Sequence, residues 1–200
     1  MEAIFYRMMT EFRFLPNSPT LMNAGRRLGQ LAACFVLPVE DSMEGIFDAL
    51  KHAAIIHKSG GGTGFSFSRL RPKNSRVGTT GGVASGPVSF MQIWDAMCAT
   101  ILSTGARRGA MMATLRCDHP DIEAFIEAKR ERGRLRMFNL SVLVTDAFMQ
   151  AVKEDAPWEL TFEGAAYKSL KARELWDKIM RATYAYAEPG VIFIDRINAR

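Results

Sequence analysis

Along this chain, segments with the apolar spacing of a strand alternate with segments that have the apolar spacing of a helix. The sequence therefore predicts alternating strands and helices. The short apolar run Cys34–Val39 is typical of a buried strand, and Gly64–Ser68 alternates apolar and polar residues as a half-buried strand does. After Asp41 or Ser42, either of which can cap a helix, apolar residues recur with the helical period as far as Lys58. The same criteria predict further strands at 110–115, 139–144, 158–162 and 191–194, and further helices at 1–13, from Pro87, from Asp118, from Thr145 and at 171–187.

The order of these elements favours an α/β fold built on a largely parallel sheet, because full-length helices separate successive strands. No change of composition marks a domain boundary, and the glycine-rich stretch 72–86 is predicted to be a loop. Since the chain stops at Arg200 directly after a strand, we expect a fragment of a larger protein. The core face predicted for the helix after Ser42 consists of Phe47, Leu50, Ala54 and His57.

Composition and charge exclude some classes of protein. The 26 basic and 21 acidic residues give a net charge of +5 at pH 7, which suits phosphate-bearing small molecules and does not require nucleic acid. No apolar run approaches the roughly 20 residues that span a bilayer. The charged residues among the first 13 positions are also unlike a signal peptide. We therefore expect a cytoplasmic protein with no membrane or nucleic-acid partner.

The three cysteines, Cys34, Cys98 and Cys117, stand far apart in the sequence. This spacing excludes a disulfide scaffold and a metal-ligand pattern, so any redox chemistry would use an individual thiol. By position alone, Cys34 at the head of an apolar strand is most simply a small core residue. Spacing does not separate it from the other two.

Three segments rich in small or polar residues are candidates for ligand binding. Residues 17–25 (NSPTLMNAG) form either a helix-capping turn or a set of donors for phosphate or ribose oxygens. Residues 59–64 (SGGGTG) contain more glycine than a helix end needs, which lets the backbone approach a ligand closely. They form neither a Walker loop nor a Rossmann fingerprint, because no Gly-Lys-Ser/Thr follows and the glycines precede a strand. In 103–109, Arg107 and Arg108 suit phosphate or base recognition, or else a solvated turn.

Taken in order, several long segments resemble the catalytic subunit of ribonucleotide reductases. They are LPNSPTLMNAG, ACFVLPVEDS, GGGTGFSFSRLRP, GGVASGPVSFM, ARRGAMMATLRCDHPDIEAFI and NLSVLVTDAF, and the EPGVIFIDRIN ending is similar as well. The resemblance runs from about Phe12 to Asn198. The segments GGGTGFSFSRLRP and GGVASGPVSF are most similar in sequence to the adenosylcobalamin-dependent class, class II.

The resemblance implies a ten-stranded α/β barrel made of two parallel five-stranded halves, with a finger loop inside it. Residues 1–200 would be a partial catalytic domain: the first half of the barrel, ending before the finger loop. The thiyl cysteine, the second redox cysteine and a later phosphate-binding helix would lie beyond Arg200. We therefore expect the fragment itself to be inactive and to bind no cofactor.

The reaction implied by the resemblance replaces the ribose 2′-hydroxyl of a ribonucleoside diphosphate or triphosphate by hydrogen. A cysteine thiyl radical abstracts the 3′-hydrogen, and a cysteine pair then delivers two electrons and becomes a disulfide. The implied partners are deoxynucleoside triphosphate or ATP effectors and a thioredoxin- or glutaredoxin-type reductant. Adenosylcobalamin is the implied cofactor of the full-length enzyme, which would be a homodimer.

Residue by residue, the resemblance assigns Cys34 to the first member of the reducing pair, and no catalytic position to Cys98 or Cys117. The residues that match substrate-contacting positions are Thr20, Ala33, Gly61 and Gly62, with Ser18 a weaker candidate.

A second group of residues matches the specificity site, where a deoxynucleoside triphosphate binds. It comprises Asp41, Ser42 and Arg71. Thr79 and Thr80 fall in the first specificity loop, 79–82, and Arg107 and Arg108 in the second, 105–109, with Arg108 expected to reach the substrate base.

Two other interpretations remain open. One is the di-metal-dependent class I catalytic subunit, whose radical is generated by a separate subunit. The other is a non-catalytic nucleotide-binding module that uses Arg71 and the Arg107–Arg108 pair, and such a module would not need a redox thiol at Cys34.

Overall fold

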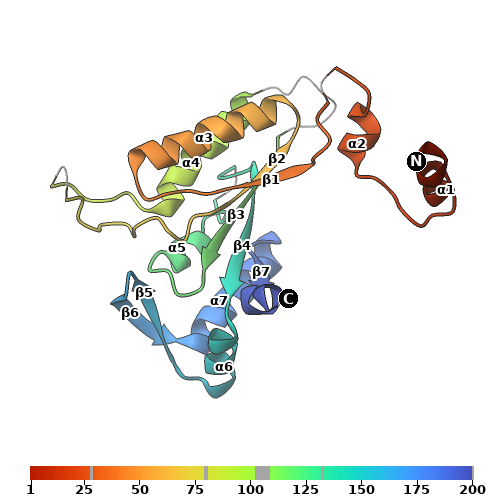
Figure 1. Cartoon of the computed structure of the whole chain (residues 1–200). Helices are drawn as coiled ribbons and strands as arrows, with labels where there is room; N and C mark the ends of the chain where they lie inside the picture. Colours follow the sequence, from red (N-terminus) through yellow and green to blue (C-terminus); the bar gives the residue numbers. More distant parts are fainter. Residues whose placement is uncertain (28, 79–80, 102–108, 132, 200) are drawn as a thin grey trace.

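The computed structural model describes residues 1–27, 29–78, 81–101, 109–131 and 133–199. A five-stranded sheet forms its centre (Figure 1). Every neighbouring pair of strands is parallel, which confirms the predicted α/β fold. The strands, in spatial order, are β1 (Cys34–Leu37), β2 (Gly62–Ser66), β3 (Met111–Arg116), β4 (Phe138–Val144) and β7 (Gly190–Phe193).

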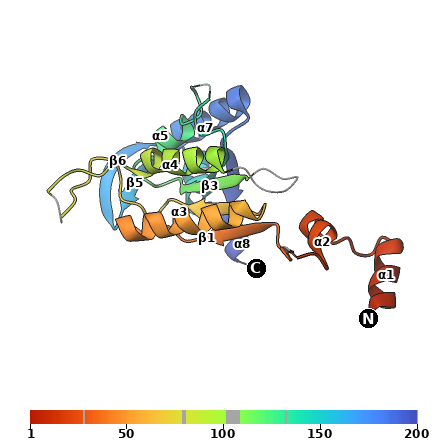
Figure 2. The ribbon, with the colours of Figure 1, turned by 90° about the horizontal axis from the view of Figure 1, so that it is seen from above.

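Helices cover one face of this sheet. α3 (Met43–Lys58) and α4 (Pro87–Thr100) lie side by side over it (Figure 2), and α5 (Ile122–Ile126) and α7 (Ala172–Tyr186) bury their apolar residues in the same core. An aromatic cluster fills the centre of that core, with ring centroids 5.4–6.5 Å apart, and each edge-to-face pair adds about 0.5–1.5 kcal/mol to simple burial. The cluster consists of Phe65, Phe67, Trp94 and Phe138.

The core face of α3 differs from the predicted one. Its fully buried residues are Ile46, Ala49, Ala53 and His57. Of the predicted face, His57 is therefore buried as expected and Leu50 packs half-buried against the core. Phe47 is 44% exposed. The reason is that apolar residues cover a wide arc of this helix, and periodicity alone does not fix which part of a wide arc faces the sheet.

The opposite face of the sheet is open among the described residues. Residues paired in register lie on the same face of the sheet. The open face therefore carries Cys34, Gly62, Gly64 and Met112, which alternate along their strands with residues buried under the helices. Val36, on the same face, is 87% exposed. Parallel sheets are normally covered on both faces, and β1 and β7 also leave two free edges. The open face is therefore where a ligand or further polypeptide would pack.

A small antiparallel hairpin lies between α6 (Asp146–Glu154) and α7. It consists of β5 (Pro157–Phe162), which was predicted, and β6 (Ala165–Lys171), which was not. β6 escaped prediction because it is almost wholly exposed and lacks apolar alternation. Thr161 N donates to the Asp118 carbonyl at 2.7 Å and ties the hairpin to the end of β3.

The amino-terminal segment extends away from the sheet (Figures 1 and 2). α1 (Glu2–Thr10) confirms the predicted first helix, yet it buries no residue. α2 (Ser18–Asn23) occupies part of the stretch that was described as a polar loop. Two other details differ from prediction: the helix expected from Asp118 begins only at Ile122, and a short α8 (Ile194–Asn198) follows β7. No described helix is long and apolar enough to span a membrane.

Candidate functional site

Cys34 is the first residue of β1, and its thiol is exposed on the open face. The interpretation of Cys34 as a small core residue is therefore wrong. A β-carbon built on Gly62, its partner in register, would lie 3.6 Å from the Cys34 sulfur. Gly62 N donates to the Ala33 carbonyl at 2.8 Å, which holds the two chains together beside the thiol. A ligand on the open face can reach this sulfur.

The other two cysteines behave differently. Cys98 and Cys117 are both buried, as expected for structural residues. Burial, reinforced by Asp95, raises the pKa of the Cys98 thiol, and burial raises the pKa of Cys117 to about 12. Both thiols are thus kept protonated and out of contact with solvent, which leaves Cys34 as the accessible thiol among the described residues.

The glycine bend, defined as Gly60, Gly61 and Gly62, needs its glycines for different reasons. Gly60 has φ +82° and turns the chain out of α3. At Gly61 an added β-carbon would lie 2.7 Å from Ile56 Cγ2 and 3.1 Å from Phe35 Cε2, so no side chain fits. Gly62 leaves space directly beside the Cys34 sulfur.

The turn predicted to contact substrate is tied to the segment that precedes β1. Asn17 caps α2 by accepting a hydrogen bond from Thr20 N at 2.9 Å, so the helix-capping interpretation is confirmed. Thr20 Oγ1 donates to the Leu31 carbonyl at 3.1 Å, and Asn23 Nδ2 donates to the Gln30 carbonyl at 2.9 Å. These bonds fix the turn against the segment that leads into Ala33 and Cys34, while exposed Ser18 opens α2.

The three described residues predicted for an effector site also meet. Asp41 accepts hydrogen bonds from Arg71 Nε at 2.7 Å and from Arg71 N at 3.1 Å. Ser42 is the N-cap of α3, and its hydroxyl accepts from Gly45 N at 3.0 Å. This group follows the carboxyl ends of β1 and β2, whereas Cys34 and Gly62 begin those strands. Thr79, Thr80, Arg107 and Arg108 lie outside the described residues.

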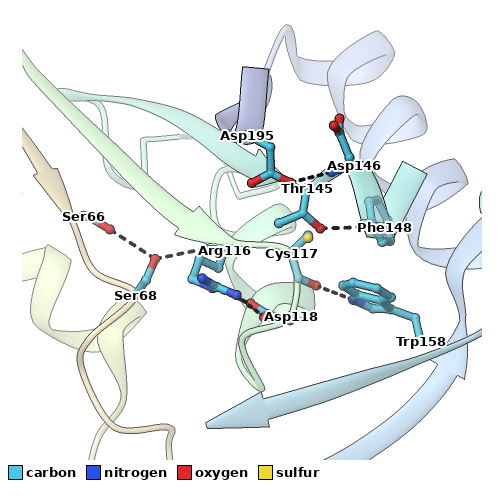
Figure 3. A network of polar contacts seen from close by, with 10 residues as sticks. All are labelled: Ser66, Ser68, Arg116, Cys117, Asp118, Thr145, Asp146, Phe148, Trp158 and Asp195. Atoms are coloured by element: carbon cyan, nitrogen blue, oxygen red, sulfur yellow. Dashed lines mark hydrogen bonds and ion pairs between the residues drawn. The ribbon is translucent and has the colours of Figure 1, made fainter. Parts of the chain in front are cut away.

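A polar network at the carboxyl end of β3 was not anticipated (Figure 3). The Arg116 guanidinium donates through Nε to Asp118 Oδ1 at 2.8 Å and through Nη2 to Oδ2, and these bonds raise the pKa of Arg116. Arg116 N donates to Ser68 Oγ at 3.0 Å, and Trp158 Nε1 donates to the Cys117 carbonyl at 3.1 Å. A cavity of about 430 Å³ adjoins the network and reaches Asp41.

Sequence reasoning missed this network because its members come from three separate segments without a motif. Their charges are satisfied by one another, and the network joins β2, β3 and the hairpin at the end of the sheet that carries Asp41. Its arrangement therefore supports the scaffold on which Asp41 and Arg71 lie.

Replacing Gly62 by alanine tests whether a ligand must approach Cys34. The new methyl would lie 3.6 Å from the Cys34 sulfur and 3.3 Å from the Ala110 carbonyl, which must shift by a few tenths of an ångström to admit it. The methyl would still occupy space that a ligand needs beside the thiol. For the reaction that the resemblance implies, we therefore expect kcat/KM of the full-length protein to fall by about a hundredfold. Gly64→Ala is the matched control, because its methyl lies on the same face with only Met112 Cβ at 4.0 Å. Equal losses in both variants would argue against a ligand at Gly62.

Comparison with known proteins adds to this geometry. A family model for the ribonucleotide reductase barrel domain matches residues 32–200, and one for the ribonucleotide reductase all-alpha domain matches residues 1–29. A vitamin B12-dependent ribonucleoside-diphosphate reductase of Thermoplasma acidophilum is 54% identical over 199 residues, covering 98% of this chain and 26% of the relative. The corresponding protein of Mycobacterium tuberculosis strain H37Rv is 49% identical over 197 residues, covering 97% and 28%.

A solved structure shares the fold. The class Id ribonucleotide reductase alpha subunit of Actinobacillus ureae superposes with a TM-score of 0.79 at 22% identity, over 98% of this chain and 34% of that one. The chain spans about a quarter of the length of the curated relatives it matches. The expectation of a ribonucleotide reductase barrel fold is thereby confirmed.

Proposed function

Because this chain belongs to the ribonucleotide reductase large-subunit family, we propose that its full-length protein reduces ribonucleotides to deoxyribonucleotides as a class II enzyme. Ribonucleoside diphosphates are the proposed substrates, in keeping with the names of the relatives, with triphosphates as the alternative. The observation that carries the proposal is the exposed Cys34 thiol beside the glycine bend on an open sheet face, with the α2 turn tied to the segment that leads into β1.

Cys34 is proposed as one of two thiols that reduce the sugar. A thiyl radical elsewhere in the protein removes the 3′-hydrogen and returns it at the end. Cys34 gives its proton to the leaving 2′-hydroxyl, which departs as water. The pair supplies two electrons and two protons in all and becomes a disulfide, so one ribonucleotide and two thiols yield one deoxyribonucleotide, one disulfide and one water. A thioredoxin- or glutaredoxin-type dithiol then restores the pair.

Substrate binding is proposed at Thr20, Ala33, Gly61 and Gly62, around the same sulfur. Thr20 donates its hydroxyl hydrogen to the Leu31 carbonyl, so its oxygen remains free to accept from a ribose hydroxyl. At Gly62 the lack of a side chain lets the sugar come close to the thiol.

Effector binding is proposed beyond the carboxyl ends of β1 and β2, at Asp41, Ser42 and Arg71. The carboxylate of Asp41 can accept from a deoxyribose hydroxyl while it orients the guanidinium of Arg71 toward phosphates. Thr79, Thr80, Arg107 and Arg108 complete this site in the proposal. In the proposal, a dNTP there biases substrate choice through the second specificity loop, 105–109, which would lie between effector and substrate, and this is allosteric coupling.

Adenosylcobalamin is the proposed cofactor, and when bound it supplies the radical that is passed to the thiyl cysteine. We assign no residue of this chain to the cofactor. A homodimer in the cytoplasm completes the proposal.

The direct test is conversion of CDP to dCDP by the full-length protein with dithiothreitol, with and without adenosylcobalamin. We expect dCDP only when the cofactor is present. Activity that depends instead on a separate metal-containing subunit would favour the class I alternative. Nucleotide binding without conversion under either condition would favour the non-catalytic module.

A further inference from the structure

We infer that His57 is a positioning residue that joins Thr63, the residue after the glycine bend, to Gly109, and so helps the bound effector to influence which substrate is accepted. The inference rests on the proposed function and extends it to a residue with no assigned role. Gly109 is the last residue of the predicted second specificity loop, 105–109. His57 lies between the two elements that an effector and a substrate would each contact.

The location of His57 is unusual for its residue type. It occupies the last turn of α3, where a protonated histidine at the surface would favour the negative end of the helix dipole. Instead the side chain turns inward and is only 1% exposed. Burial lowers the pKa of His57, so the ring is neutral at physiological pH.

One ring nitrogen contacts the strand residue that follows the glycine bend. His57 Nε2 lies 2.8 Å from the hydroxyl of Thr63, which is itself buried in β2. Thr63 follows Gly62, and its backbone N donates to the Ala110 carbonyl at 3.0 Å. The hydrogen bond therefore fixes the ring to the residue beside the one that flanks the Cys34 sulfur.

The other side of the ring lies against Gly109. A β-carbon built on Gly109 would be 3.1 Å from both Cγ and Nδ1 of His57, and 3.1 Å from the sulfur of Cys98. The backbone of Gly109 is thus packed onto the imidazole, and a displacement of either must move the other. Ala110, whose carbonyl holds Thr63, is the next residue along the chain.

The chemistry of the site argues for a role beyond packing. Nδ1 is buried and has no hydrogen-bond partner among the described residues, a situation that native cores seldom keep. Leucine or methionine would fill the same volume without leaving a polar atom unpaired. Retaining the imidazole gives one rigid, neutral ring that bonds Thr63 at one edge and contacts Gly109 at the other.

The test uses the full-length enzyme with ADP, CDP, GDP and UDP in competition, alone and with each of dATP, dCTP, dGTP and dTTP. His57→Phe keeps an aromatic ring but loses Nε2, and Thr63→Val removes the hydroxyl with little change of shape. From the proposed effector site we expect bound dNTP to shift the product ratio of the wild-type enzyme. We expect that shift to shrink at least fivefold in both variants, relative to each variant's own effector-free ratio. Thr63→Ser, which keeps the hydroxyl, should restore it.

A binding readout separates this role from a structural one. Coupling is reciprocal, so CDP should change the Kd of each dNTP less in the two variants than in wild type. Wild-type effector shifts in both variants would overturn the inference, and so would unfolding of both at 25 °C, since His57 would then only support the fold. Wild-type enzyme that forms no deoxyribonucleotide would refute the proposed function itself. Wild-type enzyme that turns over without effector shifts would refute the inference and the proposed effector coupling, but not the proposed ribonucleotide reduction.

Discussion

Full-length enzyme carrying Cys34→Ser should lose multiple-turnover ribonucleotide reduction by about a thousandfold or more, as expected when a group that takes part in the chemistry is removed. A serine hydroxyl cannot form the disulfide that supplies the two electrons, although it occupies nearly the same space. The exposed position of Cys34 means that this exchange should leave folding unchanged. The measurement is dCDP formation with excess dithiothreitol.

Thiol counting makes the result specific to redox chemistry. With substrate but no reductant, wild-type enzyme should lose two titratable thiols for each dCDP formed, whereas Cys34→Ser should lose none. Cys117→Ala is the control, because Cys117 is buried behind the sheet and its thiol has a pKa of about 12. Unchanged multiple-turnover activity in Cys34→Ser would remove the redox assignment.

Much of the sheet could be predicted from apolar periodicity, because strands β1, β3, β4 and β7 have short, apolar sequences. Exposure of Cys34 could not be predicted in the same way. Its run CFVLPV has the composition of a buried strand, yet β1 is an edge strand with one open face. Periodicity reports which residues are apolar, whereas exposure depends on what covers each face.

In the candidate site, too, some features could be predicted from the sequence and others could not. The positions of Thr20, Gly62 and Asp41 were assigned by resemblance, and the structure brings them near the partners described above. The contacts of His57 were beyond prediction, because they depend on how α3, β2 and Gly109 pack in three dimensions. The helical pattern placed His57 on the core face, but it gave no sign that one nitrogen would reach Thr63.

Glu188 shows how long-range pairing escapes sequence patterns, and it is the site of the largest stability effect that we expect. Its carboxylate lies 2.9 Å from Lys129 Nζ and accepts from Leu140 N at 3.0 Å. Lys129 Nζ also donates to the Phe138 carbonyl. The side chains of Lys129 and Glu188 are only 18% and 20% exposed. Residues far apart in sequence thus hold the start of β4 next to the turn that leads into β7.

Glu188→Ala should therefore lower the free energy of unfolding by about 3 kcal/mol, because it leaves a poorly solvated ammonium and a strand N–H without their partner. Glu188→Gln keeps an oxygen for Leu140 N and should cost less. The matched control is Glu40→Ala, whose Arg69 partner lies 3.1 Å away with the two side chains 59% and 72% exposed. An ion pair this exposed contributes less than about 1 kcal/mol.

Urea-induced unfolding of the full-length variants, compared at equal m-values and without nucleotides, measures both changes. The Glu188 variant should unfold at clearly lower urea than the Glu40 variant. If the two midpoints fall by the same amount, the burial of the Lys129–Glu188 pair does not govern its contribution. In that case the start of β4 must be held mainly by its apolar residues, Phe138 and Leu140, which are 1% and 2% exposed.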